Sequence, residues 1–203
     1  MKILLYIFSF VFFIFGVWQV YRAFSNKKYE NLETDILVSF NKIKFQVYKE
    51  YTKASLSLDS KSISNANGKF SILANYIIGG NKENQQISMT SPVLYNIKNE
   101  STFSFIMPSS YKKNTLPLPK NNSIFFNTEY NQFVASIEFG GFANDQICNI
   151  KHKELKAFLI SKEIAFKNDF TIAVYNSPYD LINRKNEIWI EVNQEELRKK
   201  LGI

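Results

Sequence analysis

The sequence predicts an α+β fold in which one curved antiparallel sheet or open barrel carries two helices, preceded by a single transmembrane helix. Three observations support this prediction. Short segments alternate apolar and polar residues, as half-buried strands do. The order of strands and helices occurs twice, as two successive β-β-α-β-β units. An uncharged apolar run occupies residues 3–21, near the N-terminus.

The apolar run approaches the length of about 20 residues that spans a bilayer. Trp18 and Tyr21 lie beside Arg22, as expected of an interfacial aromatic belt with a cationic anchor. The alternative is a cleaved signal peptide, since residues 23–25 include small side chains, but its apolar core usually has only about 7–15 residues. We therefore expect a membrane protein with an uncleaved single-pass anchor over residues 1–22. Positive charges on both sides of the run leave the side of the membrane open.

A polar tether is expected over residues 23–40, because residues 26–33 show no apolar periodicity. The soluble domain is then predicted to occupy residues 41–203. Two strands of alternating character open this domain, at residues 43–51 and 53–58.

The first helix is predicted between a cap at Asn65 or Asn67 and a stop at Gly79-Gly80. Apolar residues recur at spacings of three and four and form one face, which consists of Phe70, Leu73, Ala74 and Ile77. Strand-like segments at 86–95 and 102–107 follow and complete the first β-β-α-β-β unit.

The second unit repeats this order around a helix at about 147–163. Its predicted strands are 123–130, 133–139, 170–176 and 187–192. Odd-numbered apolar residues on the strand 133–139 share one side, while Val134, Ser136 and Glu138 share the other, which we expect to be wetter. Neither unit can cover its own apolar face, so the two units are expected to pack in a pseudo-twofold arrangement.

Composition and motifs exclude several classes of function. The net charge of +7 comes from scattered lysines, and no basic block alternates with aromatic residues, so we expect no nucleic-acid partner. Cys148 is the single cysteine, which rules out an intramolecular disulfide and a C-x-x-C pair. The sequence lacks H-E-x-x-H, G-x-S-x-G and G-x-x-x-x-G-K, so we assign no catalytic residues.

Four segments together resemble the SOUL/haem-binding-protein (HEBP) family. Residues 70–95 resemble its helix ending in YI-x-G-x-N followed by I-x-MT-x-PV, and residues 105–121 resemble F-x-MP with a spaced LP-x-P. FGGFA at 139–143 follows, and residues 173–192 resemble Y-x-x-P and R-x-NE-[IV]-W. The matches occur in order from about residue 43 to 193 and so cover essentially the whole soluble domain.

This resemblance implies a distorted β-barrel flanked by two helices, and binding of haem or a related tetrapyrrole. We therefore expect non-enzymatic binding of an apolar macrocycle in a hydrophobic groove. One alternative is a small-molecule hydrolase of the related GyrI-like type, which would use Glu187 with a tyrosine such as Tyr175 across an open groove. A second is a ligand-free interaction module whose groove is filled by its own side chains. The oligomeric state stays open.

Candidate haem-binding residues lie on the first helix and before the last strand. The apolar groove is expected near Phe70, Leu73, Ala74 and Tyr76, and the candidate propionate contacts are Lys69, Asn75 and Arg184. The alternative is structural, because periodic apolar residues usually form the contact between a helix and a sheet. Arg184 would then pair with Glu187 in a turn closed by Asn186.

His152 is the one candidate axial ligand among the imidazoles, because the chain has a single histidine. It lies at the margin of the apolar face of the second helix, which is centred on Ile147, Ile150, Leu155, Phe158 and Leu159. A histidine at such a boundary is more often a partly exposed surface residue than a metal ligand.

Overall fold

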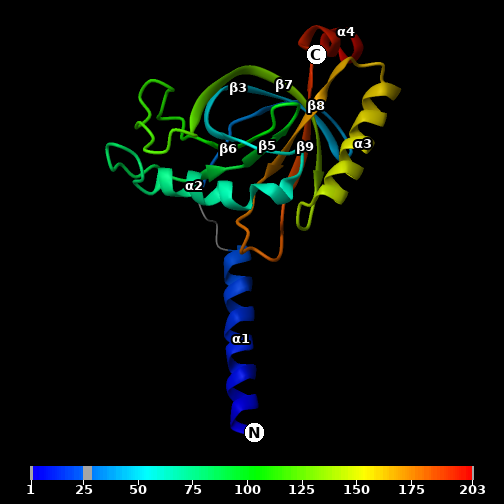
Figure 1. Cartoon of the computed structure of the whole chain (residues 1–203). Helices are drawn as coiled ribbons and strands as arrows, with labels where there is room; N and C mark the ends of the chain where they lie inside the picture. The colour runs from blue at the N-terminus through cyan, green and yellow to red at the C-terminus, as the bar shows by residue number, and fades with distance from the viewer. Residues whose placement is uncertain (1, 25–28, 203) are drawn as a thin grey trace.

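The computed structural model describes residues 2–24 and 29–202, and Figure 1 shows their arrangement. The elements in chain order are α1 (Lys2–Phe24), β1 (Glu30–Asn31), β2 (Asp35–Phe40), β3 (Ile43–Ser57), the short 3-10 helix η1 (Ile63–Ala66), α2 (Asn67–Ile77), β4 (Thr90–Ser91), β5 (Val93–Ile97), β6 (Thr102–Ile106), β7 (Phe125–Phe139), α3 (Asp145–Ser161), β8 (Phe166–Val174), β9 (Asn186–Val192) and α4 (Gln194–Leu201). The predicted α+β class is confirmed.

Six antiparallel strands close into a barrel in the order β3-β6-β5-β8-β9-β7, because β7 also pairs with β3. Closure pairs the edges that an open sheet of this size would expose. β2 adds to the outside of this ring by pairing with the first half of β3, and β1 pairs with β4 in parallel. Residues 35–40 therefore belong to the sheet, and their assignment to a tether is wrong.

α1 is a helix of 23 residues that leads away from the barrel (Figure 1). In the described part of the chain, no helix combines the length and the apolar character needed to cross a membrane. Residues 25–28 of the predicted tether lie outside the described residues, as does Ser25 of the signal-like triplet.

Two predicted strand pairs are each a single long strand. β3 replaces 43–51 and 53–58, and β7 replaces 123–130 and 133–139. Tyr51 is buried, and its cross-strand pairing with Glu129 continues past the expected break. The sequence has no Gly or Pro there to interrupt the ladder. β3 and β7 instead bend together around the barrel, as Figure 1 shows.

α3 covers one outer face of the barrel. Its buried side chains Cys148, Leu155 and Leu159 pack with isoleucines of β7 and β9. The helix begins two residues earlier than predicted because Asn144 caps it, accepting a hydrogen bond from the Ile147 amide (3.0 Å). Ile150, which we expected at the centre of the buried face, is 51% exposed. The short helix α4 was not predicted; it adds Leu197 to the same cluster.

α2 packs over β3 and β6 through Leu73, Tyr76 and Ile77. Its N-cap position is Ala66, so the predicted cap at Asn65 or Asn67 is wrong. The helix ends at Ile77, two residues before Gly79, so its predicted end at the two glycines is correct to within two residues. A Cβ at Gly80 would lie 2.6 Å from the Asn75 carbonyl oxygen, so only glycine allows this close approach.

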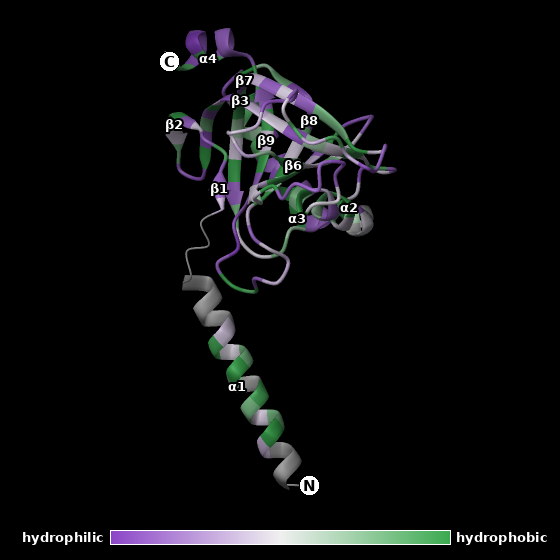
Figure 2. Ribbon diagram, turned by 90° about the vertical axis from the view of Figure 1, so that its left-hand side faces the viewer, coloured by the Kyte–Doolittle hydropathy of each residue, from purple (hydrophilic) through white to green (hydrophobic). Residues whose placement is uncertain are grey.

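The barrel interior is buried and partly polar. Trp189 and Glu187 face inward from β9, while Ile188 and Ile190 of the same strand face α3. Val134 and Ser136 of β7 are both essentially unexposed and line the closed interior, whereas Glu138, the third residue of the face that we expected to be wetter, is exposed. Figure 2 shows the corresponding alternation of hydrophobic and hydrophilic residues along the strands.

The buried thiol of Cys148 should make stability fall at alkaline pH. Burial, and secondarily Asp145, raises the pKa of Cys148 from 9.0 to about 12. The unfolded chain therefore loses this proton first, and rising pH favours unfolding. Between pH 9 and 12 the expected cost is about 1.4 kcal/mol per pH unit. Urea unfolding at pH 8, 9 and 10 measures it, and Cys148→Ala should show a shallower decline than the natural chain; equal declines would contradict the prediction.

Candidate functional site

An apolar pocket of about 600 Å³ lies between α2, β5, the β7–α3 loop and the β8–β9 loop. Its volume falls within the range of about 300–1,000 Å³ that is typical of small-molecule sites. The large apolar side chains that line it include Phe70, Met89, Val93, Tyr95, Phe142 and Pro178. We refer to this site as the apolar pocket.

Segments far apart in the sequence meet at the apolar pocket. Met89 and Val93 come from the I-x-MT-x-PV motif, Phe142 from FGGFA, Pro178 from Y-x-x-P, and Arg184 from the segment before β9. Sequence reasoning used these motifs to recognise the family, but did not use them to place the site. The motifs themselves were the sequence signal that could have pointed to Met89, Val93, Phe142 and Pro178 as site residues.

Arg184 forms the cationic wall of the apolar pocket and is 91% buried. Its Nη1 donates a hydrogen bond to the carbonyl of Ser177 (2.9 Å) and another to that of Asp180. Its guanidinium carbon lies 4.1 Å from the centre of the Phe142 ring. Burial lowers the pKa of Arg184, and its buried Nε has no hydrogen-bond partner among the described residues. The wall of the pocket therefore carries a cation, which is suited to an anionic group.

Asp145 fixes the wall of the pocket between η1 and α3. Its carboxylate accepts hydrogen bonds from the Ser62 hydroxyl (2.6 Å) and from the Ile63 amide (2.9 Å). It also lies in the first turn of α3, where a negative charge is favoured by the helix dipole. These contacts tie the segment that leads into α2 to the start of α3.

Only two of the predicted haem-binding residues line the apolar pocket, namely Phe70 and Arg184. Leu73 and Tyr76 are buried between α2 and the sheet, with Ala74 half-buried beside them, as the alternative reading of the helix required. The two remaining candidates point elsewhere. Lys69 pairs with Asp59 (3.7 Å), and the exposed Asn75 packs against Gly80.

The residues at the pocket fit an apolar macrocycle better than strong coordination of iron. His152 stacks on Phe170 with ring centres 4.0 Å apart and does not line the pocket. Tyr95 does line it, but burial raises the pKa of this phenol to about 12, which disfavours the phenolate that iron binds. Met89 is the remaining soft side chain there. Among the described residues, no three His, Cys, Asp or Glu side chains gather as a metal site requires.

Glu187 lies inside the barrel rather than in a surface ion pair with Arg184, so that predicted pair is wrong. Its carboxylate accepts hydrogen bonds from Trp189 Nε1 (2.7 Å) and the Tyr175 hydroxyl (2.9 Å), and it pairs with Lys185 (3.0 Å). Burial, the neighbouring Tyr48 and the charge of Glu187 all raise the pKa of Tyr175. Asn186 was predicted to close a turn before the last strand. Its side-chain amide instead donates a hydrogen bond to the carbonyl of Gly141 (2.9 Å).

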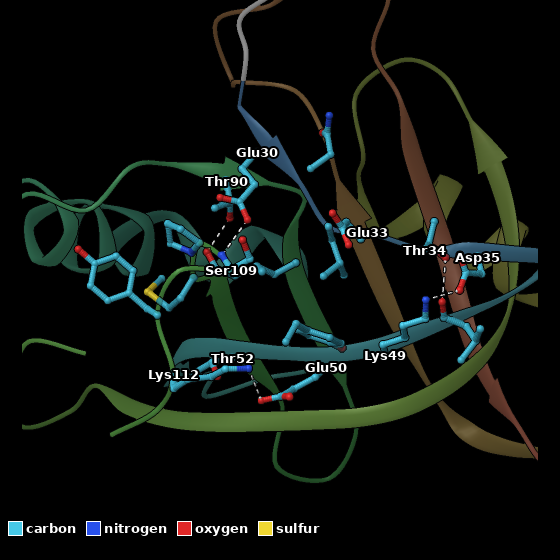
Figure 3. A pocket seen from close by; sticks show the side chains of 18 residues that line it. Glu30, Glu33, Thr34, Asp35, Lys49, Glu50, Thr52, Thr90, Ser109 and Lys112 are labelled. Atoms are coloured by element: carbon cyan, nitrogen blue, oxygen red, sulfur yellow. Dashed lines mark hydrogen bonds and ion pairs between the residues drawn. The ribbon is translucent and has the colours of Figure 1, made fainter. Parts of the chain in front are cut away.

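A second pocket, of about 390 Å³, separates the β1–β2 segment from the middle of β3. Figure 3 shows its charged side chains, none of which the sequence reasoning singled out. Most of them have partners: Asp35 pairs with Lys49 and Glu50 with Lys112, each at 3.0 Å, and Glu30 accepts a hydrogen bond from the Ser109 amide (2.7 Å). This charged groove is therefore a less suitable site for an apolar ligand than the apolar pocket.

The closed barrel and the two covering helices form a barrel domain with an apolar pocket among its loops. The profile of the family described as "SOUL heme-binding protein" matches residues 26–191, and the chain belongs to this family. Mouse "Heme-binding protein 2" is 28% identical over 148 residues, which are 64% of this chain and 68% of that protein. The human protein of the same name is 29% identical over 130 residues, 60% of this chain and 63% of that protein.

Solved structures share the fold at much lower identity. The structure titled "Crystal structure of EcmrR C-terminal domain" has a TM-score of 0.58 and 11% identity, and the match covers 74% of this chain and 96% of that one. At that identity the likeness shows the fold alone. The match covers 63% of the human relative, which is less than two thirds of its length.

Proposed function

We propose that this chain binds haem or another tetrapyrrole, without catalysing a reaction on it, in the apolar pocket. The observation that carries the proposal is the convergence of the family motifs on one pocket that combines aromatic walls with the buried cation Arg184. Tetrapyrroles have the same combination of features, an apolar ring and carboxylates at its edge. Membership of the SOUL family supports the same ligand class.

The residues have distinct tasks in this proposal. Phe70 and Phe142 would cover the faces of the macrocycle, and the positive charge of Arg184 in the pocket wall would attract a carboxylate. Asp145 would keep the two walls at a fixed separation. A bound haem would supply a redox-active iron. Met89 is the soft side chain of the pocket lining that could contact this iron.

Titration of the full chain with haemin, followed by the Soret band, tests the proposal. We expect saturable binding, and we expect Phe70→Ala to weaken it by about 5- to 30-fold, because about 1–2 kcal/mol of aromatic contact is lost. His152→Ala is the matched control and should leave affinity and spectrum unchanged, since His152 lies outside the pocket. Non-saturable partition, or an unchanged affinity in Phe70→Ala, would refute the proposal.

The two alternative functions receive less support. Glu187 contacts Tyr175, as the hydrolase hypothesis requires, but it lines neither the apolar pocket nor the charged groove. A substrate bound in either place would not touch its carboxylate. The interaction-module hypothesis requires a groove filled by the protein itself, whereas the apolar pocket has about 600 Å³ of free volume.

We also propose that α1 anchors the domain at a membrane by burying its exposed apolar side chains in lipid, although no described helix has the length and apolar character of a membrane span. Large apolar side chains along it are exposed, among them Tyr6, Ile7, Phe10, Phe13 and Val17. Exposed apolar residues in such number along one helix are unfavourable in water and favourable in lipid. Flotation of the full chain with phosphatidylcholine vesicles tests this anchor, and failure to float would contradict it.

A further inference from the structure

Apolar side chains are exposed on the β8–β9 loop, residues 175–185, beside the mouth of the apolar pocket. Tyr179 is 69% exposed, Leu181 48% and Ile182 44%, and on the neighbouring β7–α3 loop Phe142 is 52% exposed. Phe142 and Pro178 also line the pocket. We refer to these two loops as the apolar rim. Their exposure is unfavourable in water unless another apolar phase covers them.

The loop holds these side chains outward because its polar groups are bound inward. Arg184 donates hydrogen bonds to the carbonyls of Ser177 and Asp180, and the Asp180 amide donates to the Ser177 carbonyl (3.0 Å). Arg184 also lies against the ring of Phe142. One buried guanidinium thus organises both loops of the rim and the wall of the pocket.

Chain connectivity keeps the lining of the apolar pocket close to the end of α1. Tyr29 lines the apolar pocket, and α1 ends at Phe24, five residues earlier. Consecutive Cα atoms are about 3.8 Å apart, so the two residues are separated by at most about 19 Å. Figures 1 and 2 show loops of the barrel domain at the end nearest to α1, and the β8–β9 loop is one of them in Figure 1.

We propose that the apolar rim contacts the lipid surface in which α1 is anchored, so that the apolar pocket opens onto the membrane. This inference rests on the proposed membrane anchor α1. It also specifies that the proposed tetrapyrrole enters the apolar pocket from the lipid surface. An apolar macrocycle partitions into lipid, and a mouth at the membrane surface lets it pass between bilayer and pocket with little exposure to water. The rim supplies the interfacial tyrosine and aliphatic side chains that such a contact favours.

An environment-sensitive NBD label tests the contact in the full chain. Ile182→Cys places the label on the rim, and Ile160→Cys places it on an exposed isoleucine of α3, each in a Cys148→Ala background. In phosphatidylcholine vesicles, we expect the label at 182 to shift its emission to shorter wavelength and lose quenching by aqueous iodide. The label at 160 should keep both properties of a label in water. Leu181→Cys is the second rim position if Ile182→Cys fails to fold.

Each result decides the proposal. If iodide still quenches the labels at both 182 and 160, the rim contact is overturned. If both labels are equally protected from iodide, the domain adsorbs to the vesicles without a preferred face, and the rim contact is overturned as well. Flotation of the same samples reports the anchor separately, and its failure overturns the anchor and the rim contact together. Haemin titration in detergent micelles reports the ligand proposal independently of the vesicles.

Discussion

Replacing Glu187 with alanine is expected to lower the free energy of unfolding by about 2–5 kcal/mol. The substitution removes the acceptor for Trp189 Nε1 and for the Tyr175 hydroxyl, and Trp189 is only 2% exposed. A buried donor that loses its acceptor costs about 1–3 kcal/mol. Lys185 is half-exposed and can turn to solvent, so its lost ion pair adds little. Urea unfolding at pH 7 measures the difference.

Glu191→Ala on the same strand is the matched control. Glu191 pairs with Lys167 at 2.6 Å, but the Lys167 side chain is 64% exposed and that of Glu191 39%, so the loss of this pair should cost less than about 1 kcal/mol. If Glu187→Ala lowered the free energy of unfolding no more than Glu191→Ala does, the polar network inside the barrel would not stabilise the fold, and the prediction would be wrong.

Leu73→Ala is expected to cost about 2–5 kcal/mol of stability while leaving haemin affinity unchanged in the folded protein. Leu73 is completely buried between α2 and the sheet, and the truncation leaves a cavity there. It does not line the apolar pocket, although the sequence placed it in the haem groove. Thermal unfolding and a haemin titration well below the melting temperature measure the two effects separately.

Phe70→Ala, one turn earlier on α2, should show the reverse behaviour. Phe70 is 37% exposed and lines the pocket, so its loss should weaken haemin binding at a smaller cost in stability. A Leu73→Ala variant that melts normally but binds haemin weakly would place the ligand on the other side of α2 and contradict the assignment of the pocket.

Periodicity located α2, α3 and most strands of the barrel, because each of these segments carries regularly spaced apolar residues. It failed where the signal depends on tertiary pairing. The local sequence of residues 35–40 does not indicate that β2 pairs with β3. A residue such as Tyr51 has the same local pattern at the end of a strand as in the middle of a continuous strand, so the sequence does not show that β3 continues there. Closure also buries both faces of β7 at residues 134–137, which removes there the alternation of exposed and buried residues that an open sheet would show. The pseudo-twofold relation of the two units stays a prediction.

The site was harder to predict than the fold. The predicted groove consisted mainly of the apolar face of one helix. Such a face usually packs against the sheet beneath it, as Leu73 and Tyr76 do. The apolar pocket is built instead by loops that are distant in sequence, and their convergence depends on barrel closure. Arg184 was identified as a site residue, but its predicted partner was wrong because Glu187 points to the opposite face of β9, into the barrel.

The most direct test of the central claim is to locate a bound tetrapyrrole by amide chemical shifts. The full chain, labelled with nitrogen-15 in detergent micelles, is titrated with diamagnetic gallium protoporphyrin. The account predicts shifts that cluster on η1 and the start of α2, on β4 and β5, and on the two loops of the apolar rim. Shifts confined to the charged groove, or to the surroundings of His152 on α3, would contradict it.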